Sequence, residues 1–175
     1  MQKLRRSIRL PRYDYSRAGF YFVTICVRNK ECLFGEIAEG KVRLSEFGII
    51  ADECWREIPI HFNNVILALH VIMPNHIHGI LRITNVGARH ALPLQARKFG
   101  KPVAGSLPTI IGAFKSAVTR RINQVRSTPS AGFWQRNYYE HVIRNPDELS
   151  QIRQYISDNH KKWALDRENP DNSIT

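Results

Sequence analysis

The sequence has few cysteines, few acidic residues and no long apolar run. Its three cysteines, Cys26, Cys32 and Cys54, are odd in number and form no C-x-x-C pair, which argues against a disulfide framework. Cys26 and Cys54 fall in apolar segments and are expected to be reduced core residues, as in a reducing compartment. No stretch is long enough to span a membrane, and no apolar block marks a secretion signal. We therefore expect a cytoplasmic protein with no membrane partner.

Acidic residues are in deficit, because 15 Asp and Glu stand against 26 Lys and Arg, which gives a net charge of +11. Such an excess favours a polyanionic partner, although a generally basic surface would also account for it. A length of 175 residues and a hydrophobic content of 43% are typical of a single globular domain, residues 1–175. Residues 1–16 are expected to form a basic N-terminal arm, and residues 167–175 a flexible polar tail.

Hydrophobic patterning predicts the order strand, hairpin, helix, two strands, loop, helix, extended segment and helix. Ser45 is the expected N-cap of the first helix and Pro59 its end, whereas Asn145 and Pro146 begin the last helix. Residues 84–107 have no period and are interpreted as an inserted loop. This order predicts the α+β class, as a ferredoxin-like βαββαβ sandwich with an antiparallel sheet, helices on one face and an extra C-terminal helix. The predicted strands are residues 20–27, 33–37, 41–44, 65–73 and 77–83.

Two histidines, His76 and His78, follow a strand-like run and a turn at Pro74 and Asn75. Side chains of a strand alternate between faces, so both imidazoles point to one side while Ile77 points into the core. A His-x-His pair in a strand is often only structural, but this geometry also suits one divalent metal with open positions. Because no cysteine is close in sequence, Mg²⁺ or Mn²⁺ is favoured over a cysteine-bound zinc.

Tyr155 and Asn159 are four residues apart in the last predicted helix and therefore share one of its faces. Tyr155 could simply pack at the edge of the core, and Tyr138 and Tyr139 are rivals for any role of a tyrosine. A helix holds its side chains in rigid positions, however, and Asn159, one turn later, could complete the set of metal ligands. A phenol has a pKa of about 10 and needs help to act as a nucleophile, part of which a metal beside the phosphate supplies.

Basic and aromatic residues alternate in the segment that precedes the last helix and on the helix before it. Singly, each charge is most simply a solvated surface residue. Together they are typical of a groove that stacks bases and neutralises phosphates. The candidate DNA-binding residues are Lys115, Arg120, Arg126, Trp134, Arg136, Tyr138, Tyr139 and Arg144.

Several motifs, in order along the chain, resemble those of the REP-associated tyrosine transposases, a group of the IS200-like single-tyrosine transposases. Residues 73–78, Met-Pro-Asn-His-Ile-His, resemble the HUH motif of these enzymes. Residues 153–159, Arg-Gln-Tyr-Ile-Ser-Asp-Asn, resemble the segment that carries their tyrosine. The resemblance covers nearly the whole chain outside the predicted loop and tail. The other matching segments are residues 5–10, 13–16, 21–26, 32–37 and 134–141.

The resemblance implies a metal-dependent endonuclease and strand transferase that cuts single-stranded DNA beside hairpins. It implies that Tyr155 is the catalytic nucleophile, which forms a 5′-phosphotyrosine link and releases a 3′-hydroxyl. His76, His78 and Asn159 match the ligands of Mg²⁺ or Mn²⁺. The implied partner is single-stranded DNA with a stem-loop, such as a REP-like palindrome of the bacterial nucleoid. His160 departs from the family pattern, in which proline follows the asparagine.

Two other functions fit the same residues. A non-catalytic single-stranded nucleic-acid-binding module would use the same sheet and basic face, and a replication-initiator-like HUH nickase would share the chemistry but differ in target. The oligomeric state is open as well, because relatives with swapped helices place the tyrosine in trans across a dimer. The length of chain after Tyr155 favours a monomer that holds its tyrosine in cis.

Overall fold

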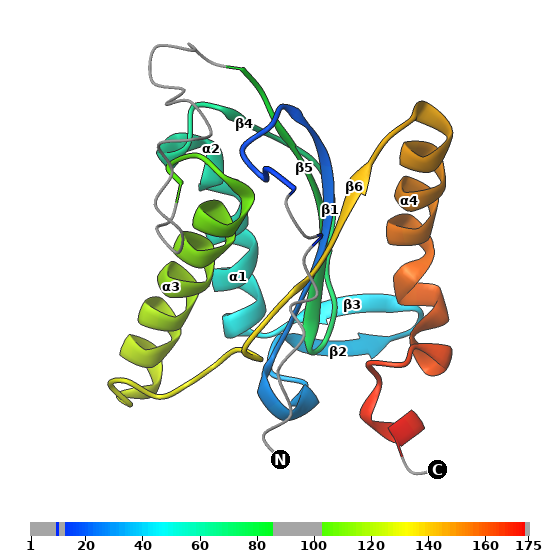
Figure 1. Ribbon diagram of the computed structural model, residues 1–175. Coiled ribbons are helices and arrows are strands. Elements are labelled where there is room, and N and C mark those ends of the chain that lie inside the picture. Colours follow the sequence, from blue (N-terminus) through cyan, green and yellow to red (C-terminus); the bar gives the residue numbers. More distant parts are fainter. Residues whose placement is uncertain (1–9, 11–12, 86–102, 174–175) are drawn as a thin grey trace, which may run out of the picture.

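The computed structural model describes residues 10, 13–85 and 103–173, and its centre is a four-stranded antiparallel sheet in the order β4-β5-β1-β6 (Figure 1). The prediction of an α+β fold with an antiparallel sheet is confirmed. The four strands are β1 (Gly19–Cys26), β4 (Val65–Ile72), β5 (His76–Ile83) and β6 (Tyr139–Ile143). The predicted hairpin forms a separate two-stranded sheet, β2 (Gly35–Ala38) and β3 (Lys41–Leu44), whose turn has positive φ at Glu39 and Gly40.

Helices cover both faces of the central sheet. α1 and α3 lie on one face, as predicted, and the extra C-terminal helix α4 lies on the other (Figure 1). Within the described ranges, no helix combines the length and the apolar character needed to cross a membrane. The α-helices are α1 (Glu46–Arg56), α2 (Ile58–His61), α3 (Leu107–Arg126) and α4 (Pro146–Asp158). The 3-10 helices are η1 (Arg28–Lys30), η4 (Asn159–Leu165) and η5 (Pro170–Ser173).

Side-chain alternation along β1 and β5 sorts the core into two clusters. Val23 and Ile77 belong to the larger cluster with α1 and α3, whereas Phe22 and Ile80 pack in the smaller one with Ile156 of α4. Burying both faces of a strand makes its register strongly specified, since a slip of one residue would exchange the two sets. Because of the same alternation, the first, third and fifth residues of β5 lie on the face of the sheet that α4 covers.

Capping residues fix where the helices begin. Ser45 Oγ accepts a hydrogen bond from Gly48 N at 3.2 Å, which confirms the predicted N-cap of α1. Asn145 Oδ1 accepts from Glu148 N at 2.8 Å, and the Glu148 carboxylate in turn accepts from Arg144 N at 2.7 Å. This exchange resembles a capping box and sets the start of α4, and with it the position of Tyr155.

Two boundaries differ from the sequence prediction. Pro59 does not end the first helix: α1 ends at Arg56, and Pro59 lies in the first turn of α2, where its missing N–H has no helical partner to lose. The predicted loop at residues 84–107 lies largely outside the described residues, and its last residue, Leu107, begins α3. Most of the predicted arm at residues 1–16 also lies outside them.

The chain from Arg167 to Ser173 has a defined conformation, where the sequence predicted a flexible tail. Asn169 is 6% exposed, and its Nδ2 donates to the carbonyl of Trp163 at 3.1 Å. The carbonyl of Glu168 accepts a hydrogen bond from Asn75 at 2.7 Å. Polar composition alone predicts exposure, but here amide side chains satisfy backbone groups and hold the segment against the sheet.

A methyl group added at Gly79 should destabilise the fold. An ideal Cβ there would overlap Cζ2 of Trp55 and lie 2.6 Å from its Cη2, and the indole is fully buried. We expect Gly79→Ala to lower the free energy of unfolding by about 1–3 kcal/mol, measured by urea denaturation. Gly112→Ala on α3 is the matched control, because its Cβ would meet nothing within 4 Å. It should instead raise stability by about 0.5–1 kcal/mol, and equal effects of the two changes would contradict the packing argument.

Candidate active site

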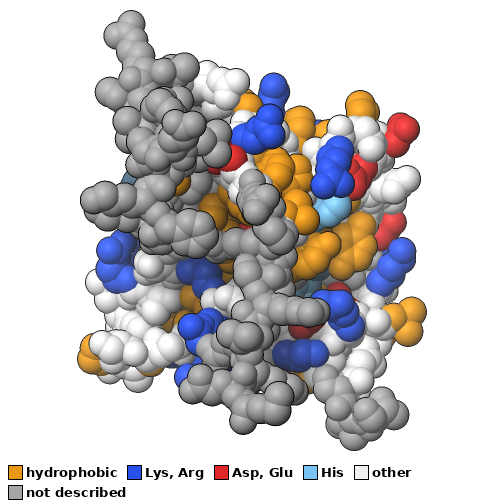
Figure 2. Space-filling model, viewed as in Figure 1, with side chains coloured by type: hydrophobic (Ala, Val, Ile, Leu, Met, Phe, Trp, Pro, Cys, Tyr) orange, Lys and Arg blue, Asp and Glu red, His pale blue; other side chains and the backbone are white. Residues whose placement is uncertain are grey.

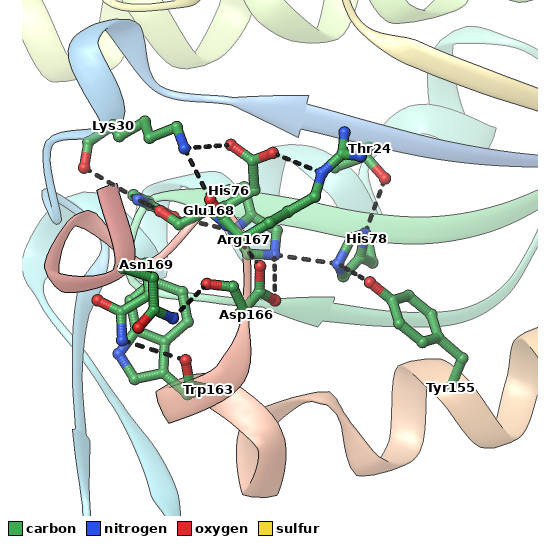
Figure 3. A network of polar contacts seen from close by, with 12 residues as sticks. Thr24, Lys30, His76, His78, Tyr155, Trp163, Asp166, Arg167, Glu168 and Asn169 are labelled. Atoms are coloured by element: carbon green, nitrogen blue, oxygen red, sulfur yellow. Dashed lines mark hydrogen bonds and ion pairs between the residues drawn. The ribbon is translucent and has the colours of Figure 1, made fainter. Parts of the chain in front are cut away.

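Two histidines lie side by side at the start of β5, on the face that α4 covers. His76 and His78 are 0% and 3% exposed, and their Nε2 atoms are 3.0 Å apart (Figure 3). Ile77 between them belongs to the core cluster on the opposite face, as the sequence predicted. The two imidazoles therefore meet at a single point beneath the C-terminal part of the chain.

Asn75 fixes the chemical state of His76. Its Nδ2 donates to the carbonyls of Lys30 at 2.9 Å and Glu168 at 2.7 Å, so its Oδ1 must face His76 Nδ1, 2.9 Å away. A carbonyl oxygen only accepts hydrogen bonds, so His76 Nδ1 carries the hydrogen and Nε2 keeps its lone pair. This is the tautomer that a metal ligand needs, held by a partner outside the ligand set.

His78 can adopt either tautomer. Its Nδ1 lies 2.8 Å from Thr24 Oγ1, and a hydroxyl can accept or donate. With the hydrogen on Nε2, His78 donates to the lone pair of His76. With the hydrogen on Nδ1, bonded to Thr24, both Nε2 lone pairs face the same point. Without a metal, the two histidines are thus hydrogen-bonded to each other. Transfer of the hydrogen from Nε2 to Nδ1 of His78 gives the metal-binding form without movement of either ring.

Burial keeps both imidazoles neutral. It lowers the pKa of His76 and of His78 from the usual value near 6.5 to about 3, and the neighbouring His76 lowers the pKa of His78 further. Both rings are therefore uncharged at neutral pH. Neutral nitrogens bind a cation without first losing a proton.

A carboxylate that sequence reasoning missed completes a cluster with the histidines. Asp166 Oδ2 lies 3.9 Å from His76 Nε2, and one ligand atom from each of Asp166, His76 and His78 lies within 4.8 Å of the others. Asp166 comes after η4, which turns the chain back over β5 (Figure 3). No sequence signal marks this approach, because it depends on how the C-terminal segment folds against the sheet.

Asn159, predicted as the third metal ligand, lies next to the tyrosine. Its side chain is 3% exposed, hydrogen-bonds Tyr155, and its Oδ1 has no hydrogen-bond partner among the described residues. A buried oxygen without a partner is costly unless something binds it, so this atom fits an oxygen ligand of a hard cation. His160, the departure from the family pattern, is not part of the His76, His78 and Asp166 cluster.

Tyr155 points its hydroxyl at the histidines. Its Oη lies 3.2 Å from His78 Nε2, in the same chain, and the side chain is 44% exposed (Figure 3). Burial of its ring raises the pKa of Tyr155, Asp166 raises it further, and the hydrogen bond from Asn159 opposes both. The hydroxyl is thus protonated at neutral pH, close to the possible metal ligands, and still open to a large substrate.

Aromatic rings surround this hydroxyl. Phe22 stacks on His78 with ring centroids 5.5 Å apart, and it makes edge contacts with Tyr155 at 6.1 Å and Tyr139 at 6.2 Å. Tyr139 is 50% exposed, whereas its neighbour Tyr138 packs against the larger core cluster. Figure 2 shows hydrophobic side chains gathered over the region of β6 and α4, with Lys and Arg side chains around them.

The candidate DNA-binding residues do not form one surface. Tyr139 lies on the face of the sheet that α4 covers, and the exposed Arg144 is near the start of α4. The guanidinium of Arg126 packs over the rings of Phe47 and Phe133, each 5.5 Å away, so it supports the core. The remaining four line hollows on the α3 side: Lys115, Arg120, Trp134 and Arg136.

Comparison with known proteins places the chain in a family. No family model matches it. It is 43% identical over 167 residues to an uncharacterized protein of Haemophilus influenzae. The matched region covers 93% of this chain and 92% of that protein, so the two chains belong to the same family. Among solved structures, the REP-associated tyrosine transposase bound to a REP hairpin superposes with a TM-score of 0.54 at 17% identity, over 88% of this chain and 73% of that one. The resemblance noted in the sequence is therefore confirmed at the level of the fold.

Removing the Asn75 side chain should weaken metal binding. Asn75→Ala deletes the acceptor for His76 Nδ1, so we expect Mn²⁺ affinity to fall by about 10- to 100-fold, the usual cost of losing such a partner. Titration calorimetry on the folded variant measures it. Asn137→Ala, at an exposed position, should bind Mn²⁺ as the wild type does. Unchanged affinity in Asn75→Ala would contradict the orienting role.

Proposed function

We propose that this protein is a metal-dependent single-stranded DNA endonuclease and strand transferase, a transposase that cuts beside DNA hairpins. The observation that carries the proposal is the position of the Tyr155 hydroxyl, 3.2 Å from His78 Nε2 and within one cluster with a second neutral histidine. The shared fold with a REP-associated tyrosine transposase supports the assignment. A tyrosine that only packed at the edge of the core would not need its hydroxyl beside two histidines.

The residues around the two histidines fit Mg²⁺ or Mn²⁺. His76 and His78 would supply nitrogens, and Asn159 and Asp166 oxygens, which together form a mixed set suited to these ions. When bound, such an ion polarises a phosphoryl oxygen and stabilises the negative charge that develops on it.

Tyr155 is the proposed nucleophile. Its Oη attacks the phosphorus of a DNA phosphodiester as the phenol loses its proton, which can pass to the water that reaches this half-exposed side chain. The bond from phosphorus to the 3′ oxygen breaks, and that oxygen takes up a proton and leaves as a 3′-hydroxyl. The 5′ side of the break stays on Tyr155 as a phosphotyrosine. Attack by another 3′-hydroxyl then reverses the chemistry and joins a new strand.

The other residues of the site orient these groups. The capped helix α4 carries Tyr155, and Asn75 fixes the tautomer of His76. Thr24 hydrogen-bonds His78, and Phe22 packs against the rings of His78 and Tyr155. The proposed substrate is single-stranded DNA with a stem-loop, such as a REP-like palindrome, in the bacterial cytoplasm. A net charge of +11 suits that polyanion.

We propose that Tyr155 acts in cis and that a monomer is sufficient. Tyr155 reaches His78 of its own chain, and α4 continues into η4 and Asp166, which return to the same histidine pair. A helix exchanged between two copies would have to carry this whole segment with it.

Hairpin DNA should be cut only when the tyrosine hydroxyl is present. Wild-type protein incubated with single-stranded hairpin oligonucleotides and Mn²⁺ or Mg²⁺ should give a protein-linked 5′ product on a denaturing gel. Tyr155→Phe should give none, because phenylalanine has no oxygen to attack with, yet it should still bind the hairpin. Tyr139→Phe is the matched control and should retain the covalent product.

Intact DNA in every lane, over a panel of hairpins and both metals, would contradict the enzyme assignment. Retained binding in that case would favour the non-catalytic module. Cleavage confined to hairpins of plasmid or phage origins would favour the replication-initiator-like nickase instead.

Mixing two inactive variants should not restore cleavage. Tyr155→Phe keeps the histidines and His76→Ala keeps the tyrosine, so a mixture can form a complete site only if the tyrosine enters another copy. Because the tyrosine lies in cis, we expect the mixture to remain inactive in the gel assay after co-refolding. Recovered cleavage would show a shared site and contradict the monomer.

A further inference from the structure

Two hollows on the α3 side of the molecule meet at one residue, Trp134. The first, of about 780 Å³, lies along the C-terminal half of α3 and the turn after it. The second, of about 480 Å³, lies between η1 and residues 132–136. Trp134 lines both, and its indole is held by a hydrogen bond from Nε1 to the carbonyl of Lys115 at 3.0 Å. We call the two hollows together the Trp134 groove.

The charge of the Trp134 groove has one sign. Among the residues that the structure describes, no Asp or Glu lines either hollow, although the chain contains 15 of them. Every charged lining residue is basic: Arg28, Lys30, Lys115, Arg120 and Arg136. A concave surface of one sign concentrates field lines and attracts a partner of the opposite charge.

Three of these cations have no carboxylate partner among the described residues. Arg28, Arg120 and Arg136 are exposed, and none forms an ion pair within the part of the chain that the structure describes. By contrast, Lys30 lies 3.7 Å from Glu168, and Lys115 donates to the carbonyl of Gln135 at 2.8 Å. The three arginines are thus free to neutralise an anion, while the two lysines are already engaged in the fold.

Backbone contacts link the second hollow to the end of the sheet that carries the histidine pair. The carbonyl of Lys30, in the second hollow, accepts from the same Asn75 amide that orients His76. Gln135 N donates to the carbonyl of Cys26 at 2.9 Å, and Cys26 pairs with His76 in the sheet. Residues that line the second hollow are therefore bonded to the end of the sheet where β1 ends and β5 begins, near which the chemistry is proposed.

We propose that the Trp134 groove binds the single strand of DNA that continues from the hairpin, through its backbone phosphates. This inference rests on the proposed function. Hollows of this size hold ligands of the size of one or two nucleotides and are too small for a duplex. An unpaired strand is also the form in which DNA must reach Tyr155, and arginines contact phosphates without regard to sequence.

The test compares hairpins with and without a single-stranded extension. Binding is measured by fluorescence anisotropy without divalent metal, so that cleavage plays no part. In the variant Arg28→Gln, Arg120→Gln and Arg136→Gln, we expect affinity for the extended hairpin to fall by about tenfold or more at 0.1 M salt. The slope of log Kd against log salt should decrease by about 2, since each lost single-strand phosphate contact contributes about 0.7. Affinity for the blunt hairpin should change little.

A matched variant separates the groove from overall charge. Arg17→Gln removes one exposed arginine at the opposite end of β1 and should leave both affinities near those of the wild type. The single variant Arg136→Gln should show about one third of the change in slope. Thermal unfolding confirms that each variant is folded.

Unchanged affinity and slope in the triple variant would overturn the proposal. An equal loss for blunt and extended hairpins would assign the groove to the stem, and an equal loss per charge in Arg17→Gln would reduce the effect to net charge; either result also overturns it. The binding and cleavage experiments can contradict the two proposals separately. Binding that depends on the groove, without any phosphotyrosine product, would refute the enzyme assignment but still support the proposal for the groove.

Discussion

One buried amide, Asn75, ties together the segments on which the site depends. It is 1% exposed, and its side chain bonds the turn at Lys30, the C-terminal segment at Glu168 and the ring of His76. Leaving a buried polar group of this amide unpaired costs about 1–3 kcal/mol, which favours the formation of all three contacts together. The orientation of His76 is therefore a property of the fold and needs no bound ion to establish it.

The histidine site and the Trp134 groove lie on opposite sides of the central sheet. The α4 face holds the histidine pair, Tyr155 and a patch of aromatic rings, whereas the Trp134 groove opens on the α3 side. Backbone contacts connect the two at one end of the sheet, where β1 leads into η1 and β5 begins. A strand bound along the groove would thus arrive at the reacting groups by passing the edge of the sheet, without any need to open the core.

The alternation of side chains along strands and the capping residues of helices predicted those parts of the site that depend on local structure. The alternation of a strand places His76 and His78 on one face, and the cap at Asn145 sets the start of the helix that carries Tyr155. The same alternation separates Tyr138 from Tyr139, which face opposite sides of the molecule although the sequence analysis grouped them.

Asp166, Arg28 and Lys30 could not be predicted in this way. Their approach to the site depends on contacts between segments far apart in the chain, such as that of Asn75 with the carbonyl of Glu168. The polar C-terminal segment has the composition of an exposed tail, and only its backbone hydrogen bonds to the rest of the molecule reveal that it covers the histidines.

The distribution of charge gives a reason why the proposed DNA binding and the proposed chemistry would lie at different places. The Asp166 carboxylate lies 3.9 Å from His76 Nε2 and would repel a DNA phosphate there unless a bound cation offset its charge. Among the described residues no carboxylate lines the Trp134 groove, so its charge would attract the same strand. Contacts made away from the reacting phosphate can then supply the binding energy that carries it into an unfavourable place, which is how remote binding contributes to a chemical step. A site that was basic throughout would hold DNA as tightly but could not also hold a divalent cation beside the nucleophile.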